Sequence, residues 1–340
     1  MQTVTLDHDK VNFTYSTDWH LSAIAPGRRA DDYLTAILGK LEFLSNLTHR
    51  IGGISLCGGD VCHIKSARHA ANSISMLGKL LCALRMFPTG KVYGTIGNHD
   101  LGYGERMDSV PHQPIGLLIA SGAYHDLSNE PVMFVNNTPH QSLMIPTVRV
   151  HVESFPFGGA ETTLKRIMAS RRHPDATHHV GIVHAYGAPG DRGSLFGEQT
   201  IGYDEVAESD FDYLLWGHDH SRIETVKVGN VTDIHLGSLA RAALDHDQTD
   251  RPVSAAILSF SDKGVIYKEI KVPVKPLAEV FVVADRGVRK VEKSEEMKEF
   301  FTKMEETVEG VETADPAEAL SLLCQDDPPL LALAKELCGM

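Results

Sequence analysis

The chain has 340 residues, 42% hydrophobic and 23% charged, which is the composition of a globular protein and excludes a disordered or fibrous one. Its formal net charge of −13 disfavours nucleic-acid binding through overall charge, although a local basic face or bound metal ions stay compatible with it. The five cysteines form no C-x-x-C pair, so they suggest neither a zinc ribbon nor a disulfide framework. Without a signal-peptide pattern or an apolar run of bilayer length, we expect a cytoplasmic protein with no membrane association.

Buried strands and amphipathic helices alternate through the first hundred residues. The first strand alternates apolar and polar side chains and stops at Asp18. The first helix has either Asp31 or Asp32 as its cap. We expect strands over residues 11–17, 52–60 and 91–100, and helices over residues 31–47 and 72–87.

The pattern of the second half of the chain predicts mainly strands. Two of them end in His or Asp, as the earlier strands do, and a turn over residues 262–264 predicts a hairpin. Since ligands gather at the carboxyl ends of strands that alternate with helices, we expect these distant polar side chains to converge. The strands are expected over residues 131–137, 141–152, 178–187, 211–220, 230–239 and 252–274.

The composition changes after Pro276, which predicts a core over residues 1–275 and a capping or partner-docking region over residues 276–340. This region is expected to contain a strand over 279–286, a helix over 294–308 and two short helices that begin at the Asp-Pro pairs 315–316 and 327–328. The apolar faces of residues 297–308 and 330–337 could dock a partner or pack on their own domain.

Five polar clusters follow the predicted strands and carry the chemistry. Each has an ordinary structural explanation when taken alone, such as a turn, a cap or a hydrogen-bonded histidine. Their occurrence together, in order and at strand ends, favours a metal site instead, and the mixture of oxygen and imidazole groups suits Mn²⁺, Fe²⁺ or Zn²⁺. The clusters are Asp18 with His20, Asp60 after two glycines, Asn98-His99-Asp100, His184, and His218 with His220.

The ordered series D-x-H, G-D, G-N-H-D, H and G-H-x-H resembles the calcineurin-like metallophosphoesterase superfamily over residues 11–222. The resemblance implies an α+β (αββα) fold, a two-layered β sandwich flanked by helices, to which we add a small C-terminal α/β cap. It implies two metal ions at one edge of the sandwich. The first ion would be held by Asp18, His20 and His220, the second by Asn98, His184 and His218, and Asp60 would bridge both.

The spacing of His218 and His220 agrees with this assignment, because residues two apart on an extended segment share a face, whereas Asp219 points elsewhere. Two such ions clamp phosphoryl oxygens and lower the pKa of a shared water, so that hydroxide attacks phosphorus in line. By the same resemblance, His99 would stabilise charge or protonate the leaving oxygen, and Asp100 would orient that imidazole.

A second, looser resemblance concerns the position where the superfamily usually has the arginine of G-D-x-x-R. Here it is His63, in G-D-V-C-H, which looks like the SbcD-type nucleases of double-strand-break repair, including phage recombination endonuclease subunits. His63 would then contact substrate, or it is an ordinary loop histidine. The resemblance implies a DNA exonuclease and endonuclease with Mn²⁺, or else Fe²⁺, Zn²⁺ or Mg²⁺.

The same resemblance implies a homodimer and an SbcC-like coiled-coil ABC ATPase as partner, since the chain itself has no Walker A motif. A small-molecule phosphodiesterase or phosphatase of the same superfamily is the alternative, and it would have little use for the region beyond Pro276 except for dimerisation. A noncatalytic scaffold on the same fold would be expected to lose metal ligands, which are all present here.

Overall fold

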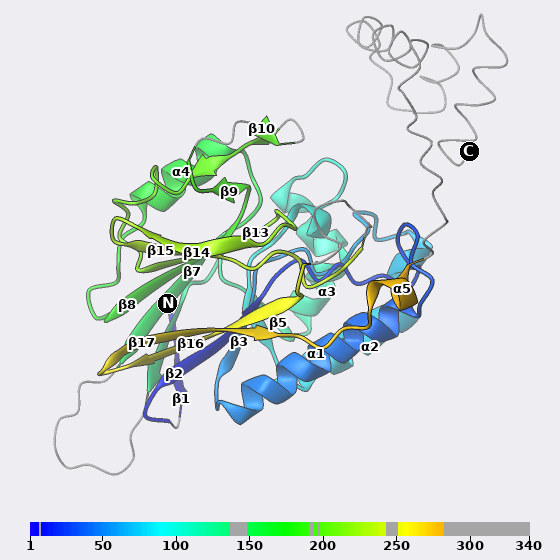
Figure 1. Cartoon of the computed structure of the whole chain (residues 1–340), viewed down its shortest axis with the longest axis horizontal. Coiled ribbons are helices and arrows are strands. Elements are labelled where there is room, and N and C mark those ends of the chain that lie inside the picture. Colours follow the sequence, from blue (N-terminus) through cyan, green and yellow to red (C-terminus); the bar gives the residue numbers. More distant parts are fainter. Residues whose placement is uncertain (7, 137–147, 191–193, 196–197, 243–250, 282–340) are drawn as a thin grey trace, which may run out of the picture. The chain divides into compact units, whose positions relative to one another are not determined.

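Two β-sheets face each other across an apolar interior, and helices cover their outer surfaces (Figure 1). The computed structural model describes residues 1–6, 8–136, 148–190, 194–195, 198–242 and 251–281. This arrangement confirms the predicted two-layered sandwich of the α+β class. The boundary expected at residue 276 and the α/β cap expected beyond it stay predictions, because most of that region lies outside the described residues.

One sheet has seven strands. Its central strands β7, β8, β13 and β15 are parallel to one another, so their carboxyl ends lie at the same edge. The strands run in the order β1 (Gln2–Leu6), β6 (Val132–Asn136), β7 (Arg149–Phe155), β8 (His178–His184), β13 (Tyr213–Gly217), β15 (Val231–His235) and β14 (Ile223–Val228).

The other sheet has six strands, of which β2, β3, β4 and β5 are parallel. Strands β16 and β17 form the hairpin predicted around residues 262–264, in which Ser261 pairs with Gly264. Gly264 has φ +117°, a conformation that favours glycine. The order is β17 (Gly264–Lys271), β16 (Ser254–Ser261), β2 (Val11–Ser16), β3 (Ile54–Cys57), β4 (Val92–Gly94) and β5 (Tyr124–Asp126).

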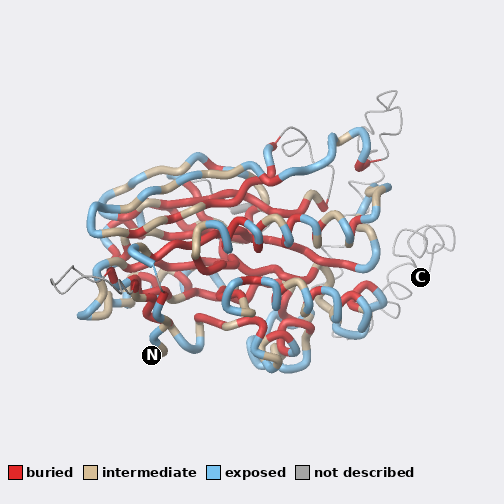
Figure 2. The backbone as a smooth tube through the Cα atoms, turned by 90° about the horizontal axis from the view of Figure 1, so that it is seen from below, coloured by how far each residue is buried: buried red, intermediate tan, exposed pale blue. Residues whose placement is uncertain are grey.

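Aromatic side chains join the two sheets in the interior. The Phe13 ring of β2 lies edge-on to Phe134 of β6, with ring centroids 5.1 Å apart, and to Phe260 of β16 at 5.8 Å. All three are fully buried, and burying a phenylalanine contributes about 1.5–3 kcal/mol. Figure 2 shows the buried strands as the inner part of the molecule, with exposed residues on its outside. The inner faces therefore fix the two sheets against each other.

Helices pack on the outer faces of both sheets. The helix predicted over residues 31–47 is α1 (Tyr33–Arg50), and Asp32 is its cap, because the Asp32 Oδ1 atom accepts a hydrogen bond from the Thr35 amide at 3.1 Å. Together with α2 (Ile74–Arg85) and α3 (Pro114–Ala120), α1 covers the six-stranded sheet. Helix α4 (Ala160–Ala169), which the sequence did not predict, covers the seven-stranded sheet.

Short elements complete the described part of the chain. Among them, the 3-10 helix η2 follows β4 and carries the predicted site residues Asn98 and His99. They are η1 (Ala70–Asn72), η2 (Asn98–Asp100), η3 (Met107–His112), β9 (Gly187–Ala188), β10 (Ser194–Leu195), β11 (Glu198–Gln199), β12 (Ile201–Gly202) and α5 (Leu277–Val280).

Helix α5 corrects the start of the strand predicted over residues 279–286, of which residues 282–286 lie outside the described part of the chain. Pro276 is the N-cap of this helix, so Glu279 and Val280 are helical and extended backbone resumes only at Phe281. The helices predicted over residues 294–308 and after 315 and 327, with the docking surfaces over 297–308 and 330–337, lie outside the described residues.

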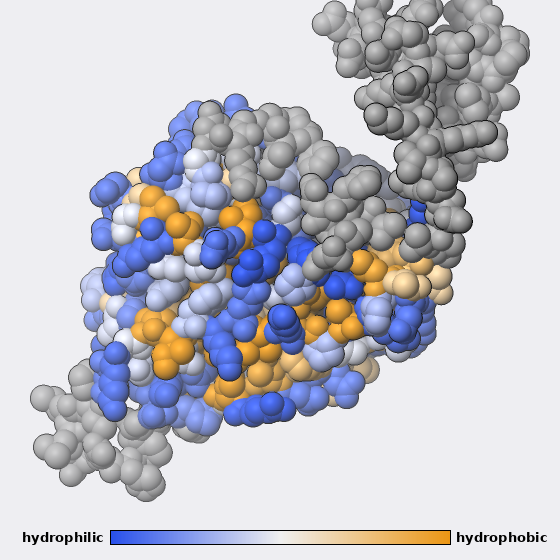
Figure 3. Space-filling model, viewed as in Figure 1, coloured by the Kyte–Doolittle hydropathy of each residue, from blue (hydrophilic) through white to orange (hydrophobic). Residues whose placement is uncertain are grey.

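The outer surface is largely hydrophilic. On the face shown in Figure 3 hydrophilic residues dominate, and the largest hydrophobic area runs along α1. Within the described ranges, none of the helices combines the length and hydropathy that crossing a bilayer requires.

Candidate metal centre

The carboxyl ends of five parallel strands bring the predicted metal ligands to one edge of the sandwich. The six-stranded sheet supplies the groups that follow β2, β3 and β4, and the seven-stranded sheet supplies those at the ends of β8 and β13. Both sheets are therefore needed to assemble the set. The residues are Asp18 and His20 after β2, Asp60 after β3, Asn98 after β4, His184 at the end of β8, and His218 and His220 after β13.

The first group of donor atoms comes from Asp18, His20, Asp60 and His220, whose ligand atoms all lie within 4.8 Å of one another. The His20 Nε2 atom lies 2.8 Å from His220 Nε2 and 3.6 Å from Asp60 Oδ2. His220 Nε2 lies 4.0 Å from Asp18 Oδ1. Two imidazoles and two carboxylates thus converge on one point.

The second group comes from Asp60, His184 and His218, again within 4.8 Å. Asn98 completes it, since its Oδ1 atom lies 3.2 Å from His218 Nδ1 and 3.3 Å from His184 Nε2. Asp60 belongs to both groups, because its Oδ1 lies 3.5 Å from His184 Nε2 while its Oδ2 faces His20. This is the position that a bridging carboxylate needs.

Hydrogen bonds fix which nitrogen of each imidazole faces the centre. The Nδ1–H of His184 donates to the Gly58 carbonyl at 2.6 Å, which leaves Nε2 as the lone-pair atom toward Asp60. The Nε2 atom of His218 lies 3.3 Å from Glu198 Oε2, so its Nδ1 faces Asn98. Both rings therefore present a lone pair to the centre.

Four of the seven ligand residues have a strained backbone. Asp18 (φ +53°), His20 (+46°), Asp60 (+52°) and His218 (+87°) lie in the left-handed region, and Glu105 is the one other non-glycine residue of the described chain that does. Such a conformation costs of order 1–3 kcal/mol per residue and is found mainly at functional sites. Backbone hydrogen bonds hold it, such as Asp18 N to Gly59 O at 3.1 Å.

Two glycines allow the backbone to approach the ligands closely. A Cβ atom on Gly97 would lie 2.1 Å from Asp60 Oδ1. A Cβ on Gly59, which also has φ +97°, would lie 2.6 Å from His184 Nδ1. Any larger residue would therefore displace a ligand, which explains why the motifs contain glycine at these positions.

The electrostatics of the centre favour a cation. Burial raises the pKa of Asp60 to about 7, and burial together with the Asp60 charge raises the pKa of Asp18. Burial and the neighbouring imidazoles lower the pKa values of His20, His184 and His220, the last to about 3. The imidazoles are thus neutral donors that lie beside two buried carboxylates, so this donor set fits two divalent ions.

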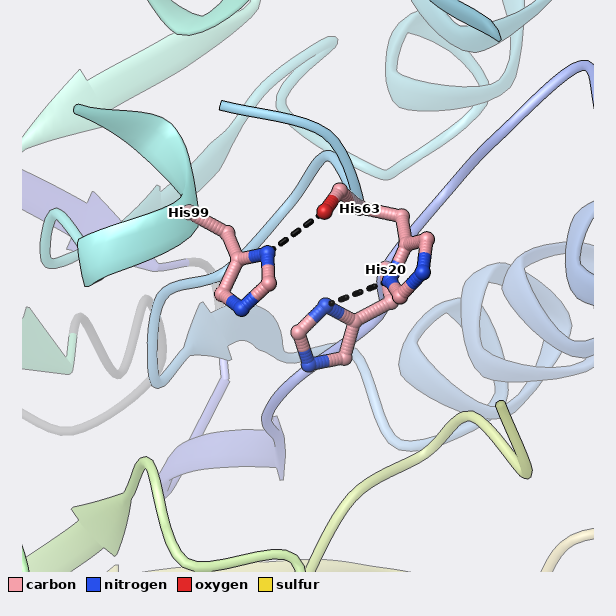
Figure 4. Close-up of side chains that lie close together, drawn as sticks. All are labelled: His20, His63 and His99. Carbon is pink, nitrogen blue, oxygen red and sulfur yellow. Dashed lines mark hydrogen bonds between the residues drawn. The ribbon is translucent and has the colours of Figure 1, made fainter. Parts of the chain in front are cut away.

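His99 lies beside the first group and its imidazole is held by the backbone of His63 (Figure 4). The Nδ1–H of His99 donates to the His63 carbonyl, and the two rings stack with centroids 5.7 Å apart. The His20 ring stands edge-on to His99 at 4.7 Å. The Nδ1 atom of His63 lies 3.5 Å from His20 Nδ1, so the predicted substrate contact lies at the centre and not on a remote loop.

Asp100 has a different role from the one predicted. Its Oδ1 accepts from the Val61 amide at 2.9 Å and its Oδ2 accepts from the Gly97 amide at 3.0 Å. The carboxylate therefore ties the loop of Asp60 to the loop of Asn98, and the His63 carbonyl, not Asp100, orients the His99 ring. Burial, then the Asp60 charge, raises the pKa of Asp100 to about 7.

Sequence reasoning missed three side chains around His218. Glu198 contacts its Nε2 atom, and the rings of Tyr186 and Phe157 lie 4.2 Å and 5.1 Å from its ring centroid. No motif marks these positions, because they reach the centre from loops and short strands far along the chain. The one available signal for Glu198 was its place directly after the glycine-rich stretch 187–197.

The model of the calcineurin-like phosphoesterase family matches residues 12–222, which include all seven predicted ligands and His99. The chain therefore belongs to the calcineurin-like phosphoesterases, a family of hydrolases that use divalent metal ions. The match covers the strands from β2 to β13 in both sheets and leaves β1 and the residues after Arg222 outside it.

Solved structures similar to this chain include the NAD nucleotidase NadN of Haemophilus influenzae, the 5′-nucleotidase precursor of Thermus thermophilus, and GAP50, the anchor in the inner membrane complex of Plasmodium. Their sequence identities are 13%, 12% and 10%, with TM-scores of 0.39, 0.39 and 0.42. The matches cover 77%, 76% and 80% of this chain, and 49%, 54% and 91% of the other chains. This chain thus spans about half the length of the first two. No curated protein matches its sequence.

Proposed function

We propose that the chain is a metal-dependent DNA nuclease, the nuclease subunit of an SbcCD-like repair or recombination complex. The observation that supports it is the place of His63, which replaces the usual arginine and lies against both His20 and His99. An arginine always carries a positive charge and pairs with phosphate through two hydrogen bonds, whereas a histidine does not. A phosphodiester carries one negative charge and a terminal monoester two, so a site with His63 suits the diester better.

When bound, the two ions would supply Lewis acidity and a nucleophilic water at neutral pH. The seven predicted ligands would hold the ions, and Asp60 would be the shared ligand, because it belongs to both groups. The Nδ1–H of His99 donates a hydrogen bond to the His63 carbonyl, so Nε2 is the ring atom that can contact a leaving oxygen. Asp100 keeps the Asp60 loop in place through the Val61 and Gly97 amides.

We propose Mn²⁺ as the native ion, since a mixture of carboxylate, amide and imidazole ligands suits it. An SbcC-like coiled-coil ABC ATPase would supply ATP chemistry, with residues 276–340 as the docking region, and a homodimer would be the working form. These proposals derive from the SbcD-like sequence features.

The net charge of −13 favours the second candidate, a small-molecule phosphodiesterase or phosphatase, because a DNA-binding surface relies on basic side chains. The partly exposed carboxylate of Glu198 beside His218 points the same way, since it would repel a long polyanion. A compact substrate would meet fewer of these charges.

Cleavage assays with Mn²⁺ on linear duplex DNA, bis(p-nitrophenyl) phosphate and p-nitrophenyl phosphate test the proposal. A nuclease cleaves the DNA and the small diester, and it prefers the diester to the monoester. Activity on the small esters alone, without DNA binding, would contradict the nuclease proposal. Asp60→Asn serves as the inactive control, because it replaces the carboxylate shared by both groups with a neutral amide of the same size.

The variant His63→Arg tests the argument from charge. It restores the usual arginine, and it keeps the backbone carbonyl that holds His99. We expect the ratio of kcat/KM for diester over monoester to fall by about 10-fold, which corresponds to roughly 1.4 kcal/mol of differential transition-state binding. An unchanged ratio would show that His63 does not select the substrate.

A further inference from the structure

A second cluster of metal-binding side chains lies on the outer face of the seven-stranded sheet. His151 and Glu153 lie two residues apart on β7 and so share a face, and His179 is paired with His151 across the β7–β8 ladder. One ligand atom from each of the three lies within 4.8 Å of the others. His151 and His179 are buried and Glu153 is half-buried.

The hydrogen bonds of His179 leave a position that only a cation or an extra proton can fill. Its Nδ1 lies 3.1 Å from the Asp210 carbonyl, which can only accept, so this nitrogen carries the proton of the neutral ring. Its Nε2 lone pair then faces Glu153 Oε1 at 2.7 Å, an acceptor against an acceptor. A metal ligand histidine has this arrangement, with its other N–H donated to a backbone carbonyl.

The rings around His179 hold it in this orientation. The Phe211 ring stacks on the His179 ring at a centroid distance of 3.9 Å, and His151 stacks on it at 4.7 Å with an interplanar angle of 16°. Ser170, at the end of α4, donates its hydroxyl proton to Glu153 Oε1. The carboxylate and the ring are thus positioned by the surrounding structure.

His151 supplies the second observation. It is 7% exposed, and its buried Nδ1 atom has no hydrogen-bond partner in the described part of the chain. Leaving a buried polar atom unpaired costs about 1–3 kcal/mol, which a bound ion would offset.

The geometry points to a third cation site in this protein, in which His151, Glu153 and His179 bind one zinc-class divalent ion. Two imidazoles and one carboxylate are a set that binds Zn²⁺ and leaves its fourth position to another ligand. His173, with its ring centroid 6.1 Å from that of His151, lies nearby. Zn–N and Zn–O bonds of about 2.0–2.1 Å at a tetrahedral angle place the two donor atoms about 3.3 Å apart. His179 Nε2 and Glu153 Oε1 are 2.7 Å apart here, so Glu153 would move by roughly 0.6 Å when the ion binds.

This site is separate from the phosphoester centre. His179 and His184 are both on β8, five residues apart, which is about 16 Å along a strand, and an odd offset places their side chains on opposite faces. The two sets of ligands have no residue in common. The proposed zinc site therefore does not depend on the proposed function.

Zinc content measured on the full-length protein tests this inference. The protein is stripped with a chelator, loaded with Zn²⁺ alone, freed of unbound ions by gel filtration, and its zinc is counted per chain by mass spectrometry. His151→Gln should contain one equivalent less than wild type, because it removes a ligand of the proposed ion. If His151→Gln does not fold, Glu153→Gln provides the same test and should also contain one equivalent less. Its amide oxygen can still accept the hydrogen bond from Ser170.

The matched control is His178→Gln. His178 precedes His179 on the same strand, and its ring packs on Phe260, on the other face of the sheet. This variant should keep the zinc content of wild type. Equal zinc in wild type, His151→Gln and Glu153→Gln would overturn the inference and leave a His179–Glu153 ion pair as the explanation of the short contact.

Discussion

The Nε2 atoms of His20 and His220 lie 2.8 Å apart, although 200 positions separate the two residues in the chain. His20 follows a strand of one sheet and His220 follows a strand of the other, so this contact exists only in the assembled sandwich. Two imidazole nitrogens at this distance repel each other unless a proton or a cation lies between or beside them.

Removal of metal ions should therefore destabilise the protein. We expect a chelator to lower the melting temperature and Mn²⁺ to restore it, with a gain of about 2.7 kcal/mol when the free ion is at 100 times its Kd. His220→Ala, which lacks a ligand of the first group, should gain less from Mn²⁺ than wild type does. Calorimetric melts with and without Mn²⁺ measure both effects, and identical melts would contradict a metal centre.

His99→Ala should lower kcat by about 10²–10⁴-fold, the usual contribution of a general acid or base. Its metal content should stay that of wild type, because His99 is not among the seven ligands. The exposed His112 of η3 gives the control His112→Ala, which should keep full activity. If His99→Ala turns over substrate at the wild-type rate, the role assigned to this imidazole is wrong.

Gly97→Ala should displace Asp60 and lower activity by about 10²-fold, the effect of a misplacement near 1 Å in a catalytic group. The reason is the 2.1 Å approach of the new Cβ to Asp60 Oδ1. Gly78→Ala is the matched control, because nothing lies within 4 Å of its Cβ position on α2. This control should raise the free energy of unfolding by about 0.5–1 kcal/mol and leave kcat unchanged. Equal kinetics of the two variants would contradict the close approach.

Asp233→Asn should stabilise the protein above neutral pH. Burial raises the pKa of Asp233 from its usual 3.8 to about 7. The hydrogen bond that Trp216 donates to its carboxylate lowers this pKa and offsets only part of the rise. A carboxyl group whose pKa is raised in the folded state contributes stability below its unfolded pKa and loses it as the pH rises through the folded value. The stability of the variant minus that of wild type should thus increase between about pH 4 and 7 and then level off.

Denaturant unfolding at a series of pH values measures this difference. The exposed hairpin residue Asp262 provides the control Asp262→Asn, which removes a charge from a solvated position. A flat difference for Asp233→Asn would show that its carboxyl group is ionised as readily in the folded protein as in the unfolded chain.

The strands that precede the polar clusters could be predicted from local patterns, whereas the two-layered sandwich and the assignment of seven metal ligands were expected from the family resemblance. Alternation of side chains marks β2, and the residue at which it stops marks the carboxyl end where Asp18 lies. The helix α1 could be predicted from its apolar face and its Asp32 cap. Parallel pairing then brings the strand ends together without further information.

Contacts between distant loops could not be predicted in the same way. Nothing in the pattern of G-N-H-D indicates that Asp100 accepts hydrogen bonds from three backbone amides while the His63 carbonyl holds His99. The cluster of His151, Glu153 and His179 depends on the register of β7 against β8, which the sequence does not specify. The strand expected over residues 279–286 began instead as a helix, because Pro276 starts a turn.

The order of the ligands along the chain has a consequence for synthesis on the ribosome. Residues 18–98 carry the oxygen donors Asp18, Asp60 and Asn98 with a single imidazole, whereas the other three imidazoles emerge only with residues 184–220. At about 5–20 residues per second, the later group follows the earlier by roughly 5–20 seconds. A nascent chain therefore presents an incomplete, oxygen-rich half that resembles a site for hard cations, and selection for the mature ions begins only after His220 has been translated.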